Sequence, residues 1–323
     1  MRLGASTIIL CFVSISVCQE APIFRVPVRL VTIPTLVFSK DNRLINGLHA
    51  SDFRVLDGGR EQSIVSDERT APFSIALAIQ TNADVREYLP AIAKTGSVVD
   101  ALLAGESGEV TVLTYSREVI LAKPFDSGDV TSALTKLSAD GRPARMIDAG
   151  LRAIALLAQR PDTRTRILVF IGQAMDNGSE SDLKSLAEAA ERQNVAIYCI
   201  SLPEFGKAFV SDTFSLQGAP KGGFTAGVDL GKLISALNRS AKAEGKTDPF
   251  SVLTAATGGT EIHSRTPRQL EDALGAIGVE LRSAYVLSYS ANSLAPGYHA
   301  VQVGVTVEGA KVYARPGYWQ TSD

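Results

Sequence analysis

The chain has 323 residues, with 32 Lys and Arg against 34 Asp and Glu, and 45% of its residues are hydrophobic. A chain of this length buries a large core and forms roughly one to three domains. The formal net charge of −2 gives no electrostatic reason to expect nucleic acid or an anionic membrane as a partner. The high hydrophobic share and the 20% of charged residues exclude a disordered chain, so we expect a globular protein.

The N-terminus predicts a secretory signal peptide. Arg2 precedes an apolar stretch over residues 3–17, and the small residue Ser16 stands two positions before Cys18. This pattern is typical of an exported protein that is cleaved after Cys18. An alternative is a lipid anchor on Cys18, because residues 15–18 loosely resemble a lipobox. An uncleaved membrane helix fits less well, because the apolar stretch is shorter than the roughly 20 residues of a span. We therefore expect the mature chain in the periplasm, at the cell surface or secreted.

Cleavage of the signal peptide changes the cysteine content of the chain. Cys11 and Cys18 are removed with it, and Cys199 is then the one cysteine that the mature chain keeps. An internal disulfide is excluded, so the hydrophobic core has to hold the fold. Cys199 lies in the apolar run 196–200, with no His nearby in sequence. We expect a buried, inert thiol rather than a nucleophile.

Both ends of the mature chain have the alternating pattern of β-strands. Residues 26–65 and 284–319 contain short β-branched runs separated by turn signals such as Asp57-Gly58-Gly59. Neither end is large enough for a β-sandwich alone, so we expect residues 19–70 and 284–323 to pair in one small β-sandwich. The apolar positions expected to face each other are Tyr285, Leu287 and Tyr289 in the tail and Val28, Leu30 and Val31 in the lead-in.

Between these ends, over residues 71–283, strand and helix patterns alternate. Apolar runs predict strands at residues 74–79, 109–115, 118–121, 166–171 and 196–201, and helical spacing predicts helices at 85–102, 146–159, 267–281 and from Ser179 to Ala190. A two-residue turn before 118–121 favours an antiparallel strand there. The last helix has a capping signature in Thr266, Pro267 and Gln269. This order predicts an α/β fold with a doubly wound, mostly parallel sheet.

One long segment interrupts the alternation. Residues 203–248 are rich in Gly, Ser and Lys and contain one expected helix near residues 230–243. A connection of this length is either a partner-binding excursion or a surface loop. We treat residues 203–248 as an insertion in the α/β domain and leave both interpretations open.

Three features together resemble a known family. They are the lead-in Asp-Phe-Arg-Val-Leu-Asp-Gly-Gly at residues 52–59, the doubly wound core, and the tail with Ala-Arg-Pro-Gly-Tyr-Trp at residues 314–319. The chain resembles the von Willebrand factor A-related proteins of acidobacteria over roughly residues 28–320. The resemblance implies a von Willebrand A-like, Rossmann-like fold, export from the cell, and a binding role.

The resemblance also implies a place to look for a cation. In von Willebrand A domains a divalent cation sits at the carboxyl end of the sheet, in a site called the MIDAS. Its ligands come from an Asp-x-Ser-x-Ser loop, a Thr of a second loop and an Asp after the fourth strand. The matching positions here are Gln80, Asn82 and Asp84 in the first loop, Ala144 in the second, and Gly172 after the fourth strand. One carboxylate and two amides make a weak cage for a hard cation, so we expect a degenerate, metal-free MIDAS and no cofactor.

The loops at the carboxyl ends of the strands remain the default crevice of a doubly wound sheet. We therefore expect them to bind a protein partner directly through hydrogen bonds. The candidate binding residues are Gln80, Asn82, Asp84, Arg145, Gln173 and Asp176. In the alternative, these are ordinary solvated loops, and the chain is a structural scaffold of the cell envelope without an apical ligand.

The sequence offers little support for an enzyme. It contains no Gly-x-Ser-x-Gly elbow, His-Glu-x-x-His, Cys-x-x-Cys, Gly-x-Gly-x-x-Gly or phosphate-binding loop. His49, His263 and His299 all lie in or beside expected strands, where a surface or edge position is more common than a catalytic one. We expect a non-enzymatic protein, and an atypical hydrolase is the least favoured alternative. No nucleic acid partner and no membrane span in the mature chain are expected.

Overall fold

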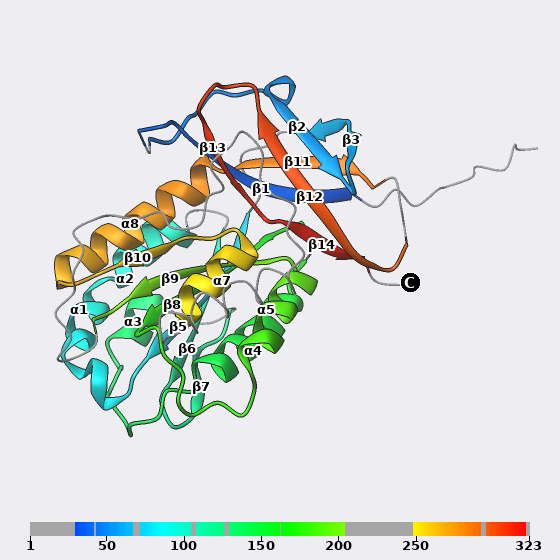
Figure 1. Cartoon of the computed structure of the whole chain (residues 1–323). Coiled ribbons are helices and arrows are strands. Elements are labelled where there is room, and N and C mark those ends of the chain that lie inside the picture. Colours follow the sequence, from blue (N-terminus) through cyan, green and yellow to red (C-terminus); the bar gives the residue numbers. More distant parts are fainter. Residues whose placement is uncertain are drawn as a thin grey trace, which may run out of the picture.

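The computed structural model describes residues 30–41, 43–66, 72–104, 108–125, 129–161, 163–203, 248–291 and 295–320. The signal-peptide pattern and the helix expected near residues 230–243 lie outside the described residues. The described chain forms an α/β domain and a β module of two small sheets that sits at one end of it (Figure 1).

The α/β domain is built on one six-stranded sheet with the order β10-β9-β8-β5-β6-β7. All neighbours are parallel except β7, which runs antiparallel to β6 after a tight turn. Numbered along the chain, this order is 3-2-1-4-5-6, the doubly wound arrangement, which confirms the predicted fold class. The strands are β5 Phe73–Gln80, β6 Glu109–Tyr115, β7 Val119–Lys123, β8 Thr165–Gly172, β9 Val195–Ser201 and β10 Glu261–His263.

Helices cover both faces of this sheet, which explains why its central strands are continuous apolar runs. Ile75, Leu77 and Ile79 of β5 face a core shared with α1, α2, α3 and α8, whereas Ala76 and Ala78 face a core shared with α4, α5 and α7. The helices are α1 Leu89–Lys94, α2 Gly96–Val98, α3 Val130–Leu134, α4 Met146–Ala158, α5 Leu183–Arg192, α7 Pro249–Thr257 and α8 Pro267–Ser283.

The segment expected as one helix over residues 85–102 is broken into pieces, so that prediction is wrong. A 3-10 turn at Ala83–Tyr88 leads into α1, α2 and then a π-helical turn at Val99–Ala104. The break falls where α3 approaches most closely, because a Cβ on Gly96 would lie 2.6 Å from the Thr131 Cα. The Thr95 hydroxyl also donates to the Ile92 carbonyl at 2.7 Å, which favours a helix end over continuation.

The helix predicted from Ser179 begins later than expected. α5 starts at Leu183, and the Asp182 carboxylate caps it by accepting a hydrogen bond from the Ser185 N–H at 2.8 Å. The start was misplaced because Ser179 also has the composition of an N-cap. In contrast, the expected cap of α8 is present, since the Thr266 hydroxyl accepts from the Gln269 N–H.

The β module consists of two antiparallel four-stranded sheets, ordered β13-β1-β11-β4 and β14-β12-β2-β3, which enclose a common core. β1 pairs with β11, so that Val31 lies opposite Tyr289 and Ile33 opposite Leu287. The strands are β1 Leu30–Phe38, β2 Phe53–Asp57, β3 Arg60–Gln62, β4 Ile64–Ser66, β11 Tyr285–Ser290, β12 Gly297–Val305, β13 Lys311–Ala314 and β14 Gly317–Gln320. A short 3-10 turn at Ala50–Asp52 precedes β2.

The residues expected to line this core are only partly correct. Val31, Tyr285, Leu287 and Tyr289 are buried in it, but Leu30 is 52% exposed. Neighbouring side chains on a strand point to opposite faces, so Leu30 and Val31 cannot both face inward. Val28 lies outside the described residues.

The two ends of the six-stranded sheet have different neighbours. The β module lies beside the amino ends of the parallel strands, where β5 begins and where the turn between α5 and β9 is located (Figure 1). The carboxyl ends of β5, β8 and β9, with the loops that follow them, lie at the opposite end, and we call them the apical face. Cys199 is buried inside β9, as predicted, and burial raises the pKa of its thiol.

Candidate functional site

Three amide side chains form a buried network at the apical face. Gln80, the last residue of β5, donates from Nε2 to the Asn82 Oδ1 at 2.8 Å and to the Gln173 Oε1 at 3.4 Å. The Gln80 Oε1 accepts from the Gln173 N–H at 2.6 Å. Gln80 and Asn82 are fully buried, and Gln173 is 2% exposed. The Gln80 amide therefore has partners at both of its ends, within the domain itself.

Asn82 ties the first apical loop to the second. Its Nδ2 donates to the Arg142 carbonyl at 2.8 Å and to the Asp84 Oδ2 at 3.0 Å. Its Oδ1 accepts from the Asp84 N–H, so Asn82 also caps the 3-10 turn that begins at Ala83. The backbone adds to this contact, because the Ala83 N–H donates to the Gly141 carbonyl. The two loops are held in one arrangement by these partly buried hydrogen bonds.

Gly172, the last residue of β8, lies against Gln80, the last residue of β5. A Cβ on Gly172 would lie 2.7 Å from the Gln80 Oε1 and even closer to the Tyr115 hydroxyl. The phenol of Tyr115 and the amide of Gln80 thus fill the space into which a longer side chain at position 172 would project. Tyr115 is fully buried, and its hydroxyl has no hydrogen-bond partner among the described residues. Burial raises the pKa of Tyr115 well above its ordinary value, so the phenol stays neutral.

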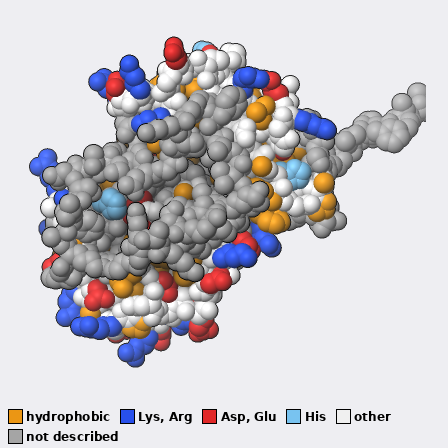
Figure 2. All heavy atoms as spheres, viewed as in Figure 1, with side chains coloured by type: hydrophobic (Ala, Val, Ile, Leu, Met, Phe, Trp, Pro, Cys, Tyr) orange, Lys and Arg blue, Asp and Glu red, His pale blue; other side chains and the backbone are white. Residues whose placement is uncertain are grey.

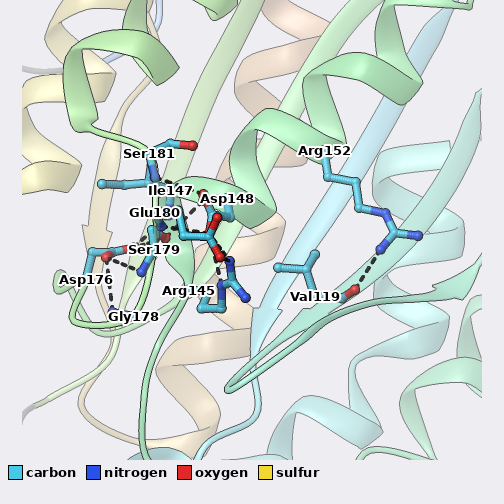
Figure 3. A network of polar contacts seen from close by, with 10 residues as sticks. All are labelled: Val119, Arg145, Ile147, Asp148, Arg152, Asp176, Gly178, Ser179, Glu180 and Ser181. Carbon is cyan, nitrogen blue, oxygen red and sulfur yellow. Dashed lines mark hydrogen bonds and ion pairs between the residues drawn. The ribbon is translucent and has the colours of Figure 1, made fainter.

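A second network surrounds Asp176, which caps α4 from outside that helix (Figure 3). Its carboxylate accepts from the Ile147 N–H at 2.8 Å, at the amino end of α4. The same carboxylate accepts from the Ser179 hydroxyl at 2.6 Å and from the Ser179 N–H at 3.1 Å. Asp176 therefore joins the loop after β8 to α4, and its oxygens are occupied by that role.

Arg145 lies at the outer side of this network, between two carboxylates (Figure 3). Its guanidinium contacts the Asp148 Oδ2 at 2.8 Å and the Glu180 Oε1 at 2.9 Å, and its side chain is 28% exposed. Burial by itself would raise the pKa of Asp148, but hydrogen bonds from Glu180, Ser181 and Arg145 lower it below its ordinary value. Asp148 stays ionised and anchors Arg145 at the surface.

The side chains at the MIDAS positions do not fit a hard divalent cation, because such a cation requires several oxygen ligands including carboxylates. Gln80 and Asn82 direct N–H groups as well as oxygens into the network, and the Asp84 Oδ2 already accepts a hydrogen bond from Asn82. Ala144 and Gly172 supply no side-chain oxygen. Within the described residues no group of three or more His, Cys, Asp or Glu is arranged to hold a metal ion.

The structure divides the six predicted site residues into two sets. Gln80, Asn82, Asp84 and Gln173 share the amide network, and Arg145 and Asp176 belong to the neighbouring one. Sequence reasoning missed the partners that complete these networks. These are Arg142, Asp148, Asn177 and Ser179. Sequence reasoning also missed Tyr115, which packs against position 172 without a hydrogen bond. The one available signal was the Asp-Asn-Gly-Ser run at residues 176–179, which has turn-forming and capping composition.

The three histidines belong to neither network. His49 precedes the 3-10 turn before β2, and His263 ends the edge strand β10. His299 lies in β12 and stacks on Tyr318 in the β module, with 5.0 Å between ring centroids.

No protein-family model matches the chain, and no curated protein sequence matches it. Similar solved structures include the conserved hypothetical protein BatB from Bacteroides thetaiotaomicron, at 10% identity and a TM-score of 0.41, with 65% of this chain and 98% of that chain covered. A von Willebrand factor type A protein from Catenulispora acidiphila has 10% identity and a TM-score of 0.48 over 93% of this chain and 76% of that chain. Proximal thread matrix protein 1 from the mussel byssus, with a zinc-occupied MIDAS motif, has 10% identity and a TM-score of 0.46 over 70% and 50% of the two chains.

The architecture of the chain itself identifies its fold class. The 3-2-1-4-5-6 strand order, the antiparallel edge strand β7 and the helices on both faces are those of a doubly wound domain. Two of the positions that the family resemblance singles out, Gln80 and Gly172, lie against each other at the carboxyl end of the sheet. The α/β part of this chain therefore has a doubly wound α/β fold, the fold class that its resemblance to von Willebrand factor A proteins implies.

Proposed function

We propose that this chain is an exported, non-enzymatic protein-binding module with a degenerate MIDAS, whose apical face binds a partner protein directly and without a metal ion. The observation that carries the proposal is the buried amide network of Gln80, Asn82 and Gln173. Its hydrogen bonds connect the apical loops from within the domain. A fully paired buried network of this kind makes loops rigid, and rigid loops lose little entropy on binding.

The contact surface in this proposal is the exposed rim around that network. Arg142, Asn177 and Glu180 are exposed, and Arg145 is partly exposed between its two carboxylates. Positive, negative and neutral polar groups thus alternate over a short distance. Figure 2 shows a similar alternation of Lys or Arg with Asp or Glu over the coloured part of the visible surface. Such a rim selects a partner by local charge complementarity rather than by a broad field.

Export is supported by the sequence pattern at residues 1–18, which lies outside the described residues. In the described part of the chain, no helix is both long and apolar enough to cross a membrane. The proposal therefore places the von Willebrand A-like domain outside the cytoplasm, where an apical face can meet another protein.

Site-specific photo-crosslinking in the cell that produces the protein tests the proposal. A photo-reactive residue replaces Asn177 on the apical rim, and a matched one replaces Glu61, whose side chain is 55% exposed on β3 of the β module. We expect a protein adduct at position 177 and none at 61. Arg142→Glu should weaken the adduct at 177 by about tenfold, as expected for the loss of about 1.4 kcal/mol at a rim charge. Adducts at 61 but not at 177 would favour the scaffold alternative.

Calorimetry with Mn²⁺ tests the metal-free part separately. The full mature chain should give no saturable heat, because the amide network offers no set of carboxylates. A dissociation constant in the micromolar range or tighter, lost in Asp84→Asn, would show that the apical face still holds a cation.

A further inference from the structure

The tail motif at residues 314–319, which the proposed function does not use, lies at the junction between the two parts of the molecule. We call Ala314–Trp319 the strap; it covers the end of β13, the turn after it and the start of β14. Among the described residues, the α/β domain and the β module have separate hydrophobic cores. A small cluster of Leu36, Phe38 and Ala284, with Leu44 and Tyr313 beside it, is the apolar contact near the junction. Beside this apolar cluster, the strap supplies polar contacts between the two parts.

Arg315 joins three parts of the chain. One terminal nitrogen of its guanidinium donates to the Asn194 Oδ1 in the turn between α5 and β9, and the other donates to the Thr32 carbonyl of β1 at 2.5 Å. Burial lowers the pKa of Arg315 to about 10, so the side chain still carries its charge at neutral pH. A single planar group thus holds one acceptor in each part of the molecule.

Asn194 has a backbone conformation that suits this contact. Its φ of 54° is the only positive value of a non-glycine residue in the described chain. Asparagine adopts this left-handed conformation more readily than most residues, and it ends α5 there. The residue therefore supplies both the turn and the acceptor for Arg315.

The rest of the strap packs on two helix ends of the α/β domain. The Trp319 indole N–H donates to the buried Glu191 Oε2 at 3.2 Å, and the Arg192 guanidinium lies 4.8 Å from the indole ring centroid. The end of α7 lies close to the strap backbone. A Cβ on Gly258 would be 2.9 Å from the backbone nitrogen of Arg315. Gly258 has a φ of 82°, so glycine is required there for two reasons.

We propose that the strap is a conformational device that fixes the orientation of the β module on the α/β domain, with Arg315 as the coupling residue. Interfaces of modest size and polar character leave domains free to move unless specific contacts hold them. The chain passes between the two parts twice, between β4 and β5 and at Ala284, the one residue between α8 and β11. The hinge in this proposal is Ala284, which has extended φ and ψ of −68° and 129°. Release of the strap leaves both cores folded and frees them to reorient about Ala284. The proposal does not depend on apical binding.

Distance measurements between two spin labels in the full mature chain test it. Labelled cysteines replace Glu308, in the exposed turn between β12 and β13, and Lys184, which is 66% exposed on α5. The native Cys199 is buried and should not react. We expect one narrow distance distribution in the parent chain and a distribution about twice as broad or broader in Asn194→Gly. Glycine keeps the left-handed turn, so this variant removes the acceptor without straining the backbone.

Arg315→Lys provides the second variant, because an ammonium group lacks the planar fork that reaches both acceptors, and it should broaden the distribution as well. Arg54→Ala is the matched control: Arg54 is an exposed arginine of the same module, paired with Glu61, and the distribution should stay narrow. Unchanged narrow distributions in both strap variants would overturn the proposal. Loss of amide-exchange protection in β1 and β11 would also overturn it, because the strap would then hold the β module folded rather than orient it.

Discussion

The apical face and the strap lie at opposite ends of one sheet and use buried polar groups in different ways. At the apical face, Gln80, Asn82 and Gln173 bond to one another and to loops of the same domain. At the strap, Arg315 and Trp319 bond across the boundary between two modules. A polar network inside one domain fixes loops, whereas a polar network between two cores fixes an orientation. Substitutions at the apical face should therefore affect partner binding, whereas substitutions in the strap should affect the distance between the two parts of the molecule.

The two ends of the sheet also differ in the pKa of a carboxyl group that each contains. Asp148 at the apical face accepts from the N–H groups of Glu180 and Ser181, and its pKa falls below the ordinary value despite partial burial. Glu280 of α8, near the strap end, is 4% exposed and accepts from the Thr260 hydroxyl at 3.1 Å. Burial raises the pKa of Glu280 to about 7. Asp148 has more hydrogen-bond donors around it than Glu280 and is also less deeply buried, and both differences favour its ionised form.

The largest effect that we predict comes from Glu280. The pKa of its carboxyl rises from an ordinary 4.5 to about 7 on folding, so its stabilising contribution is complete below pH 4.5 and is lost as the pH rises through 7. Glu280→Gln keeps an acceptor for Thr260 and does not titrate. Relative to this variant, the parent chain should lose up to about 3 kcal/mol of unfolding free energy between pH 4.5 and pH 8. Urea unfolding of both chains at a series of pH values measures the difference.

Comparison with the variant isolates Glu280 from other titrating groups, including Glu261, whose pKa burial and Asp248 also raise to about 7. Those groups are present in both chains, so their contributions cancel. Parallel pH profiles of the two chains would contradict the prediction and would mean that Glu280 is ionised in the folded protein.

The next effect tests the crowding at the apical face. Gly172→Ala places a methyl group 2.7 Å from the Gln80 Oε1 and still closer to the buried Tyr115 hydroxyl. Overpacking of this kind costs about 1–3 kcal/mol of unfolding free energy. Tyr115→Phe removes a hydroxyl that has no hydrogen-bond partner in the described chain, so by itself it should be close to neutral. In the double variant the cost of Gly172→Ala should fall. Purely additive costs in urea unfolding would show that the phenol does not crowd position 172.

The sequence predicted the parts of the fold that depend on local pattern. A few neighbouring residues are enough to predict each of these parts: the apolar run of β5, the turn that makes β7 antiparallel, and the Thr266 cap of α8. Residues 85–102 were mispredicted because the break in the helix comes from the approach of α3 to Gly96, which is a tertiary contact. The same holds for the start of α5, where Ser179 bonds to Asp176 rather than capping the helix.

The candidate site and the strap also contain some features that the sequence predicts and others that depend on tertiary contacts. Gln80 and Gly172 could be placed together from the resemblance, because they end two strands that are neighbours in the sheet. The bond between Arg315 and Asn194 spans 121 positions, and no spacing in the sequence predicts it. Likewise, the carboxylate of Asp176 was expected to face a ligand, but the structure shows it bonded to the amino end of α4. Its assignment to the binding face stays a proposal that the crosslinking experiment tests.

The smallest effect concerns the outer edge of the strap. Arg192 and Lys184 both lie within 3.7 Å of Glu188, but only Arg192 also lies over the Trp319 ring, at 4.8 Å. Both arginine and lysine here are more than half exposed, so each ion pair with Glu188 contributes little. Arg192→Ala should therefore cost about 0.5–1 kcal/mol more unfolding free energy than Lys184→Ala, which is the usual size of an exposed cation–π contact. In a Trp319→Leu background the two alanine variants should become equal. If the difference between the two variants persists without the indole, its cause is not the strap. The cause is then the position of Arg192 in the last turn of α5, where a positive charge interacts favourably with the helix dipole.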